Sequence, residues 1–274
     1  MTRHLTFTSC VDKMEGGTTL PWLIEGITDD RDYERVVLKL FRQERYGDEN
    51  PTLNEFLATF IAREFDLECP EAFILTFDEL DARLMSQEFS AAIVAGGGIG
   101  GAYFCSKHID GALPYAISMG NTDFAPDHYE CIYAFDVLIR NTDRRVNKPN
   151  LLISSGHSYL IDHEQCFFGC DNYQRIRYNQ PSWNFINPGA GIRGPHLFLS
   201  TLKRQKRSSN RITFDTFVEG LSTLNLHNIE QEVRLLERYD IDISNWYVVK
   251  NYLQEVRQDI PGFIQLLNEL IERP

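Results

Sequence analysis

The sequence predicts an α+β fold of two lobes, in which an N-terminal antiparallel sheet with one helix precedes a mainly helical lobe. β-branched and aromatic runs fill the first third of the chain, helical periodicity fills the last third, and a hairpin pattern lies between them. The length of 274 residues corresponds to just under two domains of about 150 residues each. We expect residues 1–110 to form the first lobe and residues 111–274 to form the second.

The first lobe should begin with three strands, because apolar runs at 5–11, 20–27 and 34–41 are separated by turn-like segments. Pro51 then marks a helix start, with Thr52 and Glu55 as a capping box ahead of apolar residues at helical spacing. The lobe continues with a strand at 69–77, a helix at 78–89, a glycine-rich segment at 96–101 and a strand at 102–109.

The second lobe should open with a helix at 127–139, followed by a polar loop at 140–150. Two short strands at 151–153 and 158–162 form the hairpin. Residues 171–195, rich in Asn, Pro and Gly, are expected to form an irregular loop. Five helices complete the prediction, at 195–206, 213–225, 228–238, 245–258 and 260–272.

Composition and charge exclude several classes of protein. The chain is 43% hydrophobic and 24% charged, as is ordinary for a globular protein. Its net charge of −12 argues against a protein that coats nucleic acid, which would need a basic surface. No apolar run is long enough to cross a membrane, and the N-terminus lacks a secretory signal pattern. We therefore expect a cytoplasmic protein without a membrane partner.

The six cysteines are scattered without a CxxC pair, which argues against a zinc site or a disulfide framework. The closest pair, Cys166 and Cys170, is expected to be two buried, reduced thiols.

The polar loop at 140–150 is the strongest candidate for chemistry. It gathers carboxylate, amide and cationic side chains at Asn141, Asp143, Arg144, Arg145, Asn147, Lys148 and Asn150. Asp162 follows at the end of the predicted hairpin. Phosphoryl transfer needs a carboxylate for the attacking hydroxyl and oxygen ligands for a divalent ion. Asp143 could serve the hydroxyl, while Asn150 and Asp162 could hold the metal. The alternative is an ordinary polar loop stabilised by Asx turns.

A second candidate set lies in the first lobe. Lys39 interrupts an apolar strand, so its ammonium must reach solvent or find a partner. A strand lysine paired with a helix glutamate is typical of a kinase phosphate site. Glu55 and Glu64 are both candidates for this partner. Glu55 lies opposite the apolar stripe of its helix and can face either a cleft or bulk water, whereas Glu64 lies within the stripe. The helical wheel therefore does not decide between them. The segment 15–19, EGGTT, could expose backbone amides to phosphate.

Four segments together resemble the HipA-like kinases, bacterial relatives of the protein kinases and lipid kinases. These are VVLKLF, NEFLATFIAREFDLECPE (54–71), FDVLIRNTDRRVNKPNLLI (135–153) and YLIDHEQCFF (159–168). The resemblance runs in order from about residue 12 to about residue 200 and implies a two-lobed protein-kinase-like fold.

The resemblance also implies roles for individual residues. Asp143 matches the catalytic Asp, Asn150 the loop Asn and Asp162 the metal Asp, while Lys39 and Glu55 match the lysine–glutamate pair. Gly16, Gly17 and Thr18 take the place of the phosphate-binding loop. The chain departs from the family at Arg145, where His or Thr is frequent, and at Lys148, where relatives with an Asn-Pro-Asn sequence carry Asn.

Two further motifs have simpler explanations. Gly96, Gly98 and Gly101 satisfy GxGxxG, but a dinucleotide site needs a following helix and the next segment is a predicted strand. The basic run 203–207, with Arg211, could contact nucleic acid or a phosphorylated partner, although a solvated helix end is the simpler explanation in an acidic protein.

The resulting hypothesis is a kinase that uses ATP and Mg²⁺ to phosphorylate a Ser or Thr hydroxyl of a protein, with the chain itself as one candidate acceptor. The alternatives are a nucleotide-binding pseudokinase acting as an interaction module, and a kinase for a small molecule. The resemblance also implies a small DNA-binding antitoxin as a candidate partner.

Overall fold

The computed structural model describes residues 2–15, 19, 21–41, 50–98, 100–116, 126–170, 195–209 and 212–272. The chain divides into two compact units. Unit 1 comprises Met1–Thr59, Pro70–Asp110 and His227–Ser244, and unit 2 comprises Phe60–Cys69, Gly111–Leu226 and Asn245–Pro274. The predicted lobes, 1–110 and 111–274, stay a prediction.

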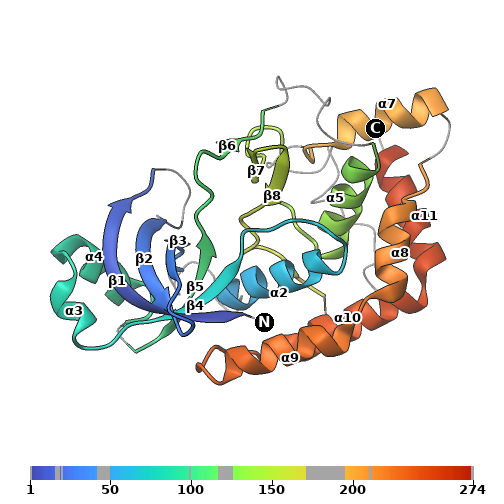
Figure 1. Ribbon diagram of the computed structural model, residues 1–274. Coiled ribbons are helices and arrows are strands. Elements are labelled where there is room, and N and C mark those ends of the chain that lie inside the picture. Colours follow the sequence, from blue (N-terminus) through green and yellow to red (C-terminus); the bar gives the residue numbers. More distant parts are fainter. Residues whose placement is uncertain are drawn as a thin grey trace. The chain divides into compact units, whose positions relative to one another are not determined.

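Unit 1 is built on five strands that match the predicted positions. They are β1 (Arg3–Lys13), β2 (Trp22–Thr28), β3 (Tyr33–Leu38), β4 (Ala72–Thr76) and β5 (Ala102–Lys107). The strands close into a barrel in the order β1-β2-β3-β5-β4 (Figure 1). The prediction of an antiparallel sheet was wrong in one respect, since β1 and β4 are parallel, with Leu5 opposite Leu75. Residue patterns indicate strands but not their directions, which the long connections and the closure of the barrel decide.

The interior of the barrel follows from the period-2 alternation of its strands. Trp22 and Ile24 of β2 point inward and are buried. Val36 and Leu38 of β3 do the same. On β5, Cys105 joins this core, whereas its neighbour Phe104 points the other way. The opposite face of β5 is therefore available to pack against a helix.

That helix is α2 (Pro51–Arg63), which begins where the sequence predicts. The proposed capping box was wrong, because Asn50 is the residue whose side-chain oxygen accepts the N–H of Leu53, at 3.0 Å. Phe56 of α2 packs edge-on against Phe104, with ring centroids 4.9 Å apart. Glu55 is thereby left available for a role other than capping.

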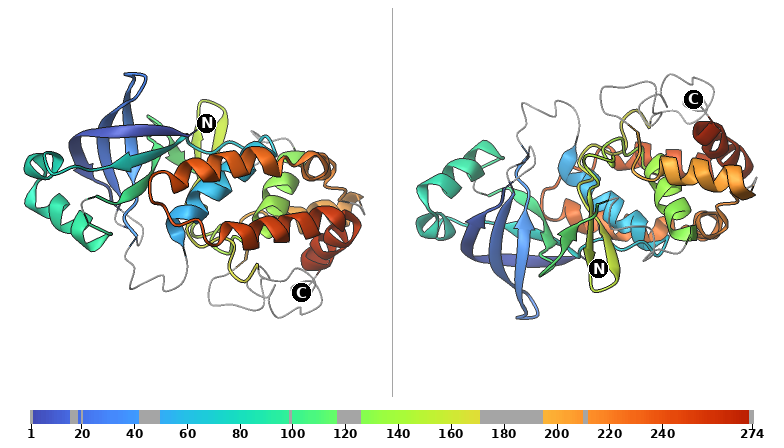
Figure 2. Two further views of the ribbon diagram at one scale, coloured as in Figure 1. Left: turned by 90° about the horizontal axis from the view of Figure 1, so that it is seen from below. Right: turned by 90° about the horizontal axis from the view of Figure 1, so that it is seen from above.

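The predicted helix at 78–89 was also wrong, because the chain forms two short helices, α3 (Asp81–Leu84) and α4 (Gln87–Ala95). Met85 is extended, and the hydroxyl of Ser86 accepts the N–H of Phe89 at 3.2 Å as a new N-cap. Both helices lie together beside the barrel in the two views of Figure 2. The glycine-rich segment 96–101 leads into β5 and not into a helix, so the dinucleotide motif is excluded. Most of α9 (Leu226–Glu237) completes unit 1.

Unit 2 contains the remaining helices and a three-stranded sheet. The helices are α5 (Pro126–Leu138), α7 (Leu199–Ser209), α8 (Asp215–Thr223), α10 (Trp246–Gln258) and α11 (Ile260–Glu272), close to their predicted ranges. The sheet consists of β6 (Leu113–Pro114), β7 (Leu151–Ser154) and β8 (His157–Leu160), in that order. β6 was not predicted, because two residues carry no periodicity.

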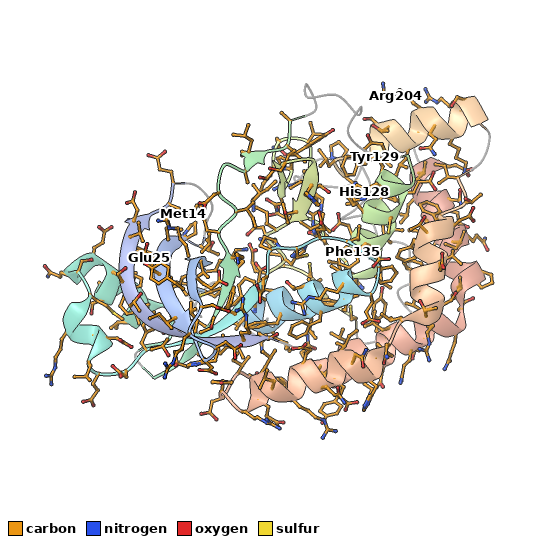
Figure 3. All side chains as sticks on the ribbon, in the orientation of Figure 1. Met14, Glu25, His128, Tyr129, Phe135 and Arg204 are labelled. Atoms are coloured by element: carbon orange, nitrogen blue, oxygen red, sulfur yellow. The ribbon has the colours of Figure 1, made fainter. Side chains whose placement is uncertain are left out.

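Helix α11 packs against α7, α8 and α10 (Figure 1). His128, Tyr129 and Phe135 lie along α5, and the exposed Arg204 lies on α7 (Figure 3). The predicted loop at 171–195 falls almost entirely outside the described residues. Within the described part of the chain, no helix combines the length and apolarity that a membrane span requires.

Candidate functional site

The first set of site residues lies in unit 1, where β3 ends against α2. Lys39 follows the buried Leu38 directly, so the alternation of the strand turns its side chain out of the barrel. The backbone N–H of Lys39 donates to the carbonyl of Phe104, the residue that faces α2. On this side the ammonium of Lys39 donates a hydrogen bond to the carboxylate of Glu55.

Both members of this ion pair are buried, with relative exposures of 8% for Lys39 and 2% for Glu55. Helix α2 is buried nearly all round, so a residue opposite its apolar stripe meets protein and not water. Glu64, the alternative partner, belongs to unit 2, where its carboxylate accepts the N–H of Asn225 at 2.9 Å. The structure therefore pairs Lys39 with Glu55.

Gly16, Gly17 and Thr18, the predicted phosphate-binding residues, lie outside the described residues. Their assignment stays a prediction.

The second set lies in unit 2, on the loop that follows α5. The Leu138 carbonyl near the end of α5 accepts a hydrogen bond from the Tyr252 hydroxyl of α10, at 2.8 Å. Arg140 then adopts φ 57°, and the N–H of Asn141 returns to the Asp136 carbonyl at 2.8 Å. The side-chain oxygen of Asn141 accepts the N–H of Asp143 at 3.0 Å. The loop is therefore a defined turn with an Asx-type bond, which the alternative of an ordinary polar loop predicts as well.

A tight turn then places three cationic or polar groups around Asp143. The backbones of Arg145 and Lys148 exchange two hydrogen bonds, at 2.9 and 3.1 Å. Arg145 donates to one oxygen of the Asp143 carboxylate at 2.7 Å, and Lys148 donates to the other. The amide of Asn150 lies 3.4 Å from that second oxygen.

Asp162 lies beside the same turn because β8 runs antiparallel to β7. The N–H of Ile161 donates to the carbonyl of Asn150 at 3.1 Å, which fixes the two segments next to each other. Lys148 donates to Asp162 at 2.7 Å and so bridges Asp143 and Asp162. Burial lowers the pKa of Lys148, but the Asp162 and Asp143 carboxylates raise it above its usual value, so the ammonium is retained.

Oxygen donors suited to magnesium gather at this point. A carboxylate oxygen of Asp162 and one of Glu164 lie within 4.8 Å of each other, and Glu164 is buried. Asn150 lies on the neighbouring segment, where its backbone carbonyl accepts the N–H of Ile161, and its side-chain amide carries a neutral oxygen. One or two carboxylates with neutral oxygens are the donor set that Mg²⁺ prefers, so these residues fit the ion. Glu164 was missed from the sequence, although its place two residues after Asp162 was a usable signal.

Beneath the turn lies a buried network that the sequence did not predict. Asp136 of α5 is fully buried and accepts hydrogen bonds from the Arg144 guanidinium at 2.7 Å and from His196 at 2.9 Å. Arg144 also donates to the carbonyl of Asn150 and lies 3.1 Å from the ring nitrogen of His163. The network therefore ties the backbone of the loop that follows α5 to that helix.

Electrostatics stabilise this network in its charged form. Burial by itself would raise the pKa of Asp136, but the charge of Arg144 and the hydrogen bond from His196 lower it to about 2. The N–H of Phe198 donates to the other ring nitrogen of His196 at 3.2 Å. His196 therefore donates to Asp136 through Nε2.

The other predictions have simple outcomes. Cys166 and Cys170 are buried and are not joined in a disulfide, as predicted. The basic run 203–207 lies on α7, where Lys206 pairs with Glu272 at 2.5 Å and Arg207 is exposed. Arg211 lies outside the described residues.

Comparisons with known proteins show what the chain is similar to. The chain is similar to the crystal structure of a Helicobacter pylori proinflammatory kinase, CtkA, with 13% identity, a TM-score of 0.48, and coverage of 97% of this chain and 99% of that one. A comparison with curated proteins found no match. A family model described as HipA-like kinase matches residues 8–177, well over half of the sequence. The chain therefore belongs to the HipA-like kinase family.

Proposed function

We propose that this protein is an ATP- and Mg²⁺-dependent kinase that transfers the γ-phosphoryl group to a Ser or Thr hydroxyl of a protein, with itself as the first acceptor to test. The observation that carries the proposal is the grouping of Asp143, Asn150 and Asp162 around one turn of a HipA-like kinase chain. The predicted two-lobed kinase-like organisation, with residues 1–110 binding nucleotide and residues 111–274 carrying the catalytic loop, is part of this proposal.

Each residue set has a chemical role in the proposal. The Lys39 ammonium neutralises nucleotide phosphates and Glu55 holds it in place, with amides of the Gly16–Thr18 segment as further phosphate donors. Asp143 aligns the acceptor hydroxyl and takes its proton. Asn150, Asp162 and Glu164 hold Mg²⁺, which, when bound, neutralises charge on the phosphates.

The proposal is tested by incubating the purified protein with labelled ATP and Mg²⁺, and locating any phosphate by mass spectrometry. Phosphorylation of Ser or Thr that is lost in Asp143→Asn supports it. Tight Mg-ATP binding without phosphorylation of the chain or of added proteins would instead favour the pseudokinase. Transfer to a small molecule alone would favour the third hypothesis. A wild type that binds no nucleotide would contradict all three.

One observation favours the pseudokinase as the second candidate. Both oxygens of the Asp143 carboxylate are engaged by cations, Arg145 on one and Lys148 on the other. Asp143 must lose at least one of these bonds before it can accept a hydroxyl proton. Co-purification of a small DNA-binding protein with the chain would test the predicted antitoxin-like partner.

A further inference from the structure

Lys148 has a position that the roles assigned above do not explain. Its ammonium lies between two carboxylates of the proposed site, bonded to Asp143 and, at 2.7 Å, to Asp162. Most long cationic side chains extend into water, because holding one in a single geometry costs rotamer entropy. Here the turn from Arg145 to Lys148 directs the side chain onto both acceptors.

The acceptors are more buried than the lysine. The side chains of Asp143 and Asp162 are 5% and 16% exposed, whereas that of Lys148 is 31% exposed. Two carboxylates held near each other in a poorly solvated place need positive charge, and Lys148 supplies it to both. Since the Lys148 side chain is partly exposed, its ammonium can move into solvent while the turn that carries it stays folded.

A divalent ion would seek the same oxygens. Mg²⁺ and Mn²⁺ bind carboxylate oxygen, and an ammonium bonded to Asp162 both blocks one of its oxygens and repels the incoming ion. Glu164 and Asn150 remain as the other oxygen donors near Asp162.

We propose that Lys148 is a resident cation of this site, which neutralises Asp143 and Asp162 and competes with the divalent ion for the Asp162 carboxylate. The inference rests on the metal role given to Asp162 in the proposed function. It makes metal binding conditional on displacing the ammonium, and so sets the concentration of free metal at which the site fills.

The test is titration of the full chain with Mn²⁺ in the absence of nucleotide. Binding is measured by calorimetry and by the loss of the electron paramagnetic resonance signal of free Mn²⁺. Lys148→Met removes the charge and keeps the length of the side chain, so Mn²⁺ should bind at least about tenfold more tightly than to the wild type. Lys148→Gln, made in parallel, should show the same gain and covers the case in which the Met variant folds poorly.

Three controls isolate the competition. Lys148→Arg keeps the charge and should stay close to the wild type. Lys206→Met removes the same charge from α7, where the partner is Glu272, and should change nothing. Adding Asp162→Asn to Lys148→Met should abolish the gain.

Equal or weaker Mn²⁺ binding by folded Lys148→Met or Lys148→Gln would overturn the proposal, because a lysine that merely stabilised the loop would weaken the site when removed. An undetectable affinity in both the wild type and these variants would overturn it as well. Since no ATP is present, this result is independent of the phosphorylation assay, and either proposal can fail without the other.

Discussion

Lys39 and Glu55, 16 residues apart in the sequence, form a buried ion pair between the end of β3 and the second turn of α2. The pair exists because the alternation of β3 turns Lys39 out of the barrel and because α2 is buried on nearly every side. A buried ammonium and carboxylate compensate each other, so the loss of either one leaves an unpaired charge in a poorly solvated place.

The first prediction concerns this pair. Lys39→Met and Glu55→Gln should each reduce ATP affinity at least about tenfold, and the double variant should be little worse than Lys39→Met, because the two side chains act as a unit. Calorimetric titration with Mg-ATP measures the cycle. Urea unfolding of each variant separates loss of binding from loss of fold. Additive effects would show that Glu55 does not act through Lys39.

The second prediction concerns Asp143. Asp143→Asn keeps the size of the side chain and removes its charge, so Mg-ATP binding should persist while phosphoryl transfer falls at least about a hundredfold. Binding and turnover are measured on the same preparation. Arg145→Gln is a useful comparison, since it frees one oxygen of Asp143 and leaves the carboxylate in place. An active Asp143→Asn enzyme would remove this residue from the catalytic role.

The third prediction concerns Asp162. Asp162→Asn replaces a charged oxygen ligand with a neutral one and should weaken the Mg²⁺-dependent part of ATP binding about tenfold or more. Calorimetry at several Mg²⁺ concentrations separates this effect from metal-independent binding. Ser158→Ala, on β8 earlier in the same hairpin, should retain wild-type Mg²⁺ dependence. Unchanged Mg²⁺ dependence in Asp162→Asn would contradict its assignment as a metal ligand.

The fourth prediction concerns the pH dependence of stability. The pKa of Asp136, about 2, is below its ordinary value of 3.8. Its ionised form therefore stabilises the fold fully above about pH 4, and this contribution is lost as the pH falls towards 2. The shift corresponds to about 2 kcal/mol. Urea unfolding of the wild type between pH 7 and pH 2 should show this loss.

In Asp136→Asn this acid-dependent loss should shrink. At pH 7 the variant should be destabilised by about 3–5 kcal/mol, because Arg144 stays buried without its carboxylate. The exposed Asp215→Asn, at the start of α8, is the control and should change stability by less than about 0.5 kcal/mol. An Asp136→Asn variant as stable as the wild type at pH 7 would contradict the proposed importance of the network.

The fifth prediction concerns packing in the barrel. A Cβ atom on Gly26 of β2 would lie 2.6 Å from Leu5 Cγ and 2.7 Å from the carbonyl oxygen of Thr6. Gly26→Ala should therefore destabilise the protein by about 1–3 kcal/mol, because the backbone of β1 would have to move. In Gly101→Ala the nearest atom lies at 3.6 Å, so this variant is the matched control. Urea unfolding of both variants measures the difference, and equal stabilities would show that β1 adapts freely.

The sequence by itself determined most helices and strands and the candidate residues, because both follow from local patterns. The period of apolar residues distinguishes strands from helices, and the polar residues Asp143, Asn150 and Asp162 around the hairpin were found as candidates because their pattern resembles that of the HipA-like kinases. The same local reasoning missed the cap of α2. Thr52 fits the capping-box motif better, but Asn50 is the residue that caps the helix.

The tertiary structure decided which side chains meet. Glu55, and not Glu64, pairs with Lys39 because α2 is buried almost all round, which the helical wheel of a single segment does not reveal. Other contacts likewise join residues from separate segments. These are the parallel pairing of β1 with β4, the bridge from Lys148 to Asp143 and Asp162, and the Asp136–His196 contact. Periodicity reports whether a residue is buried, whereas its partner depends on how distant segments pack, and that information is spread over the whole chain.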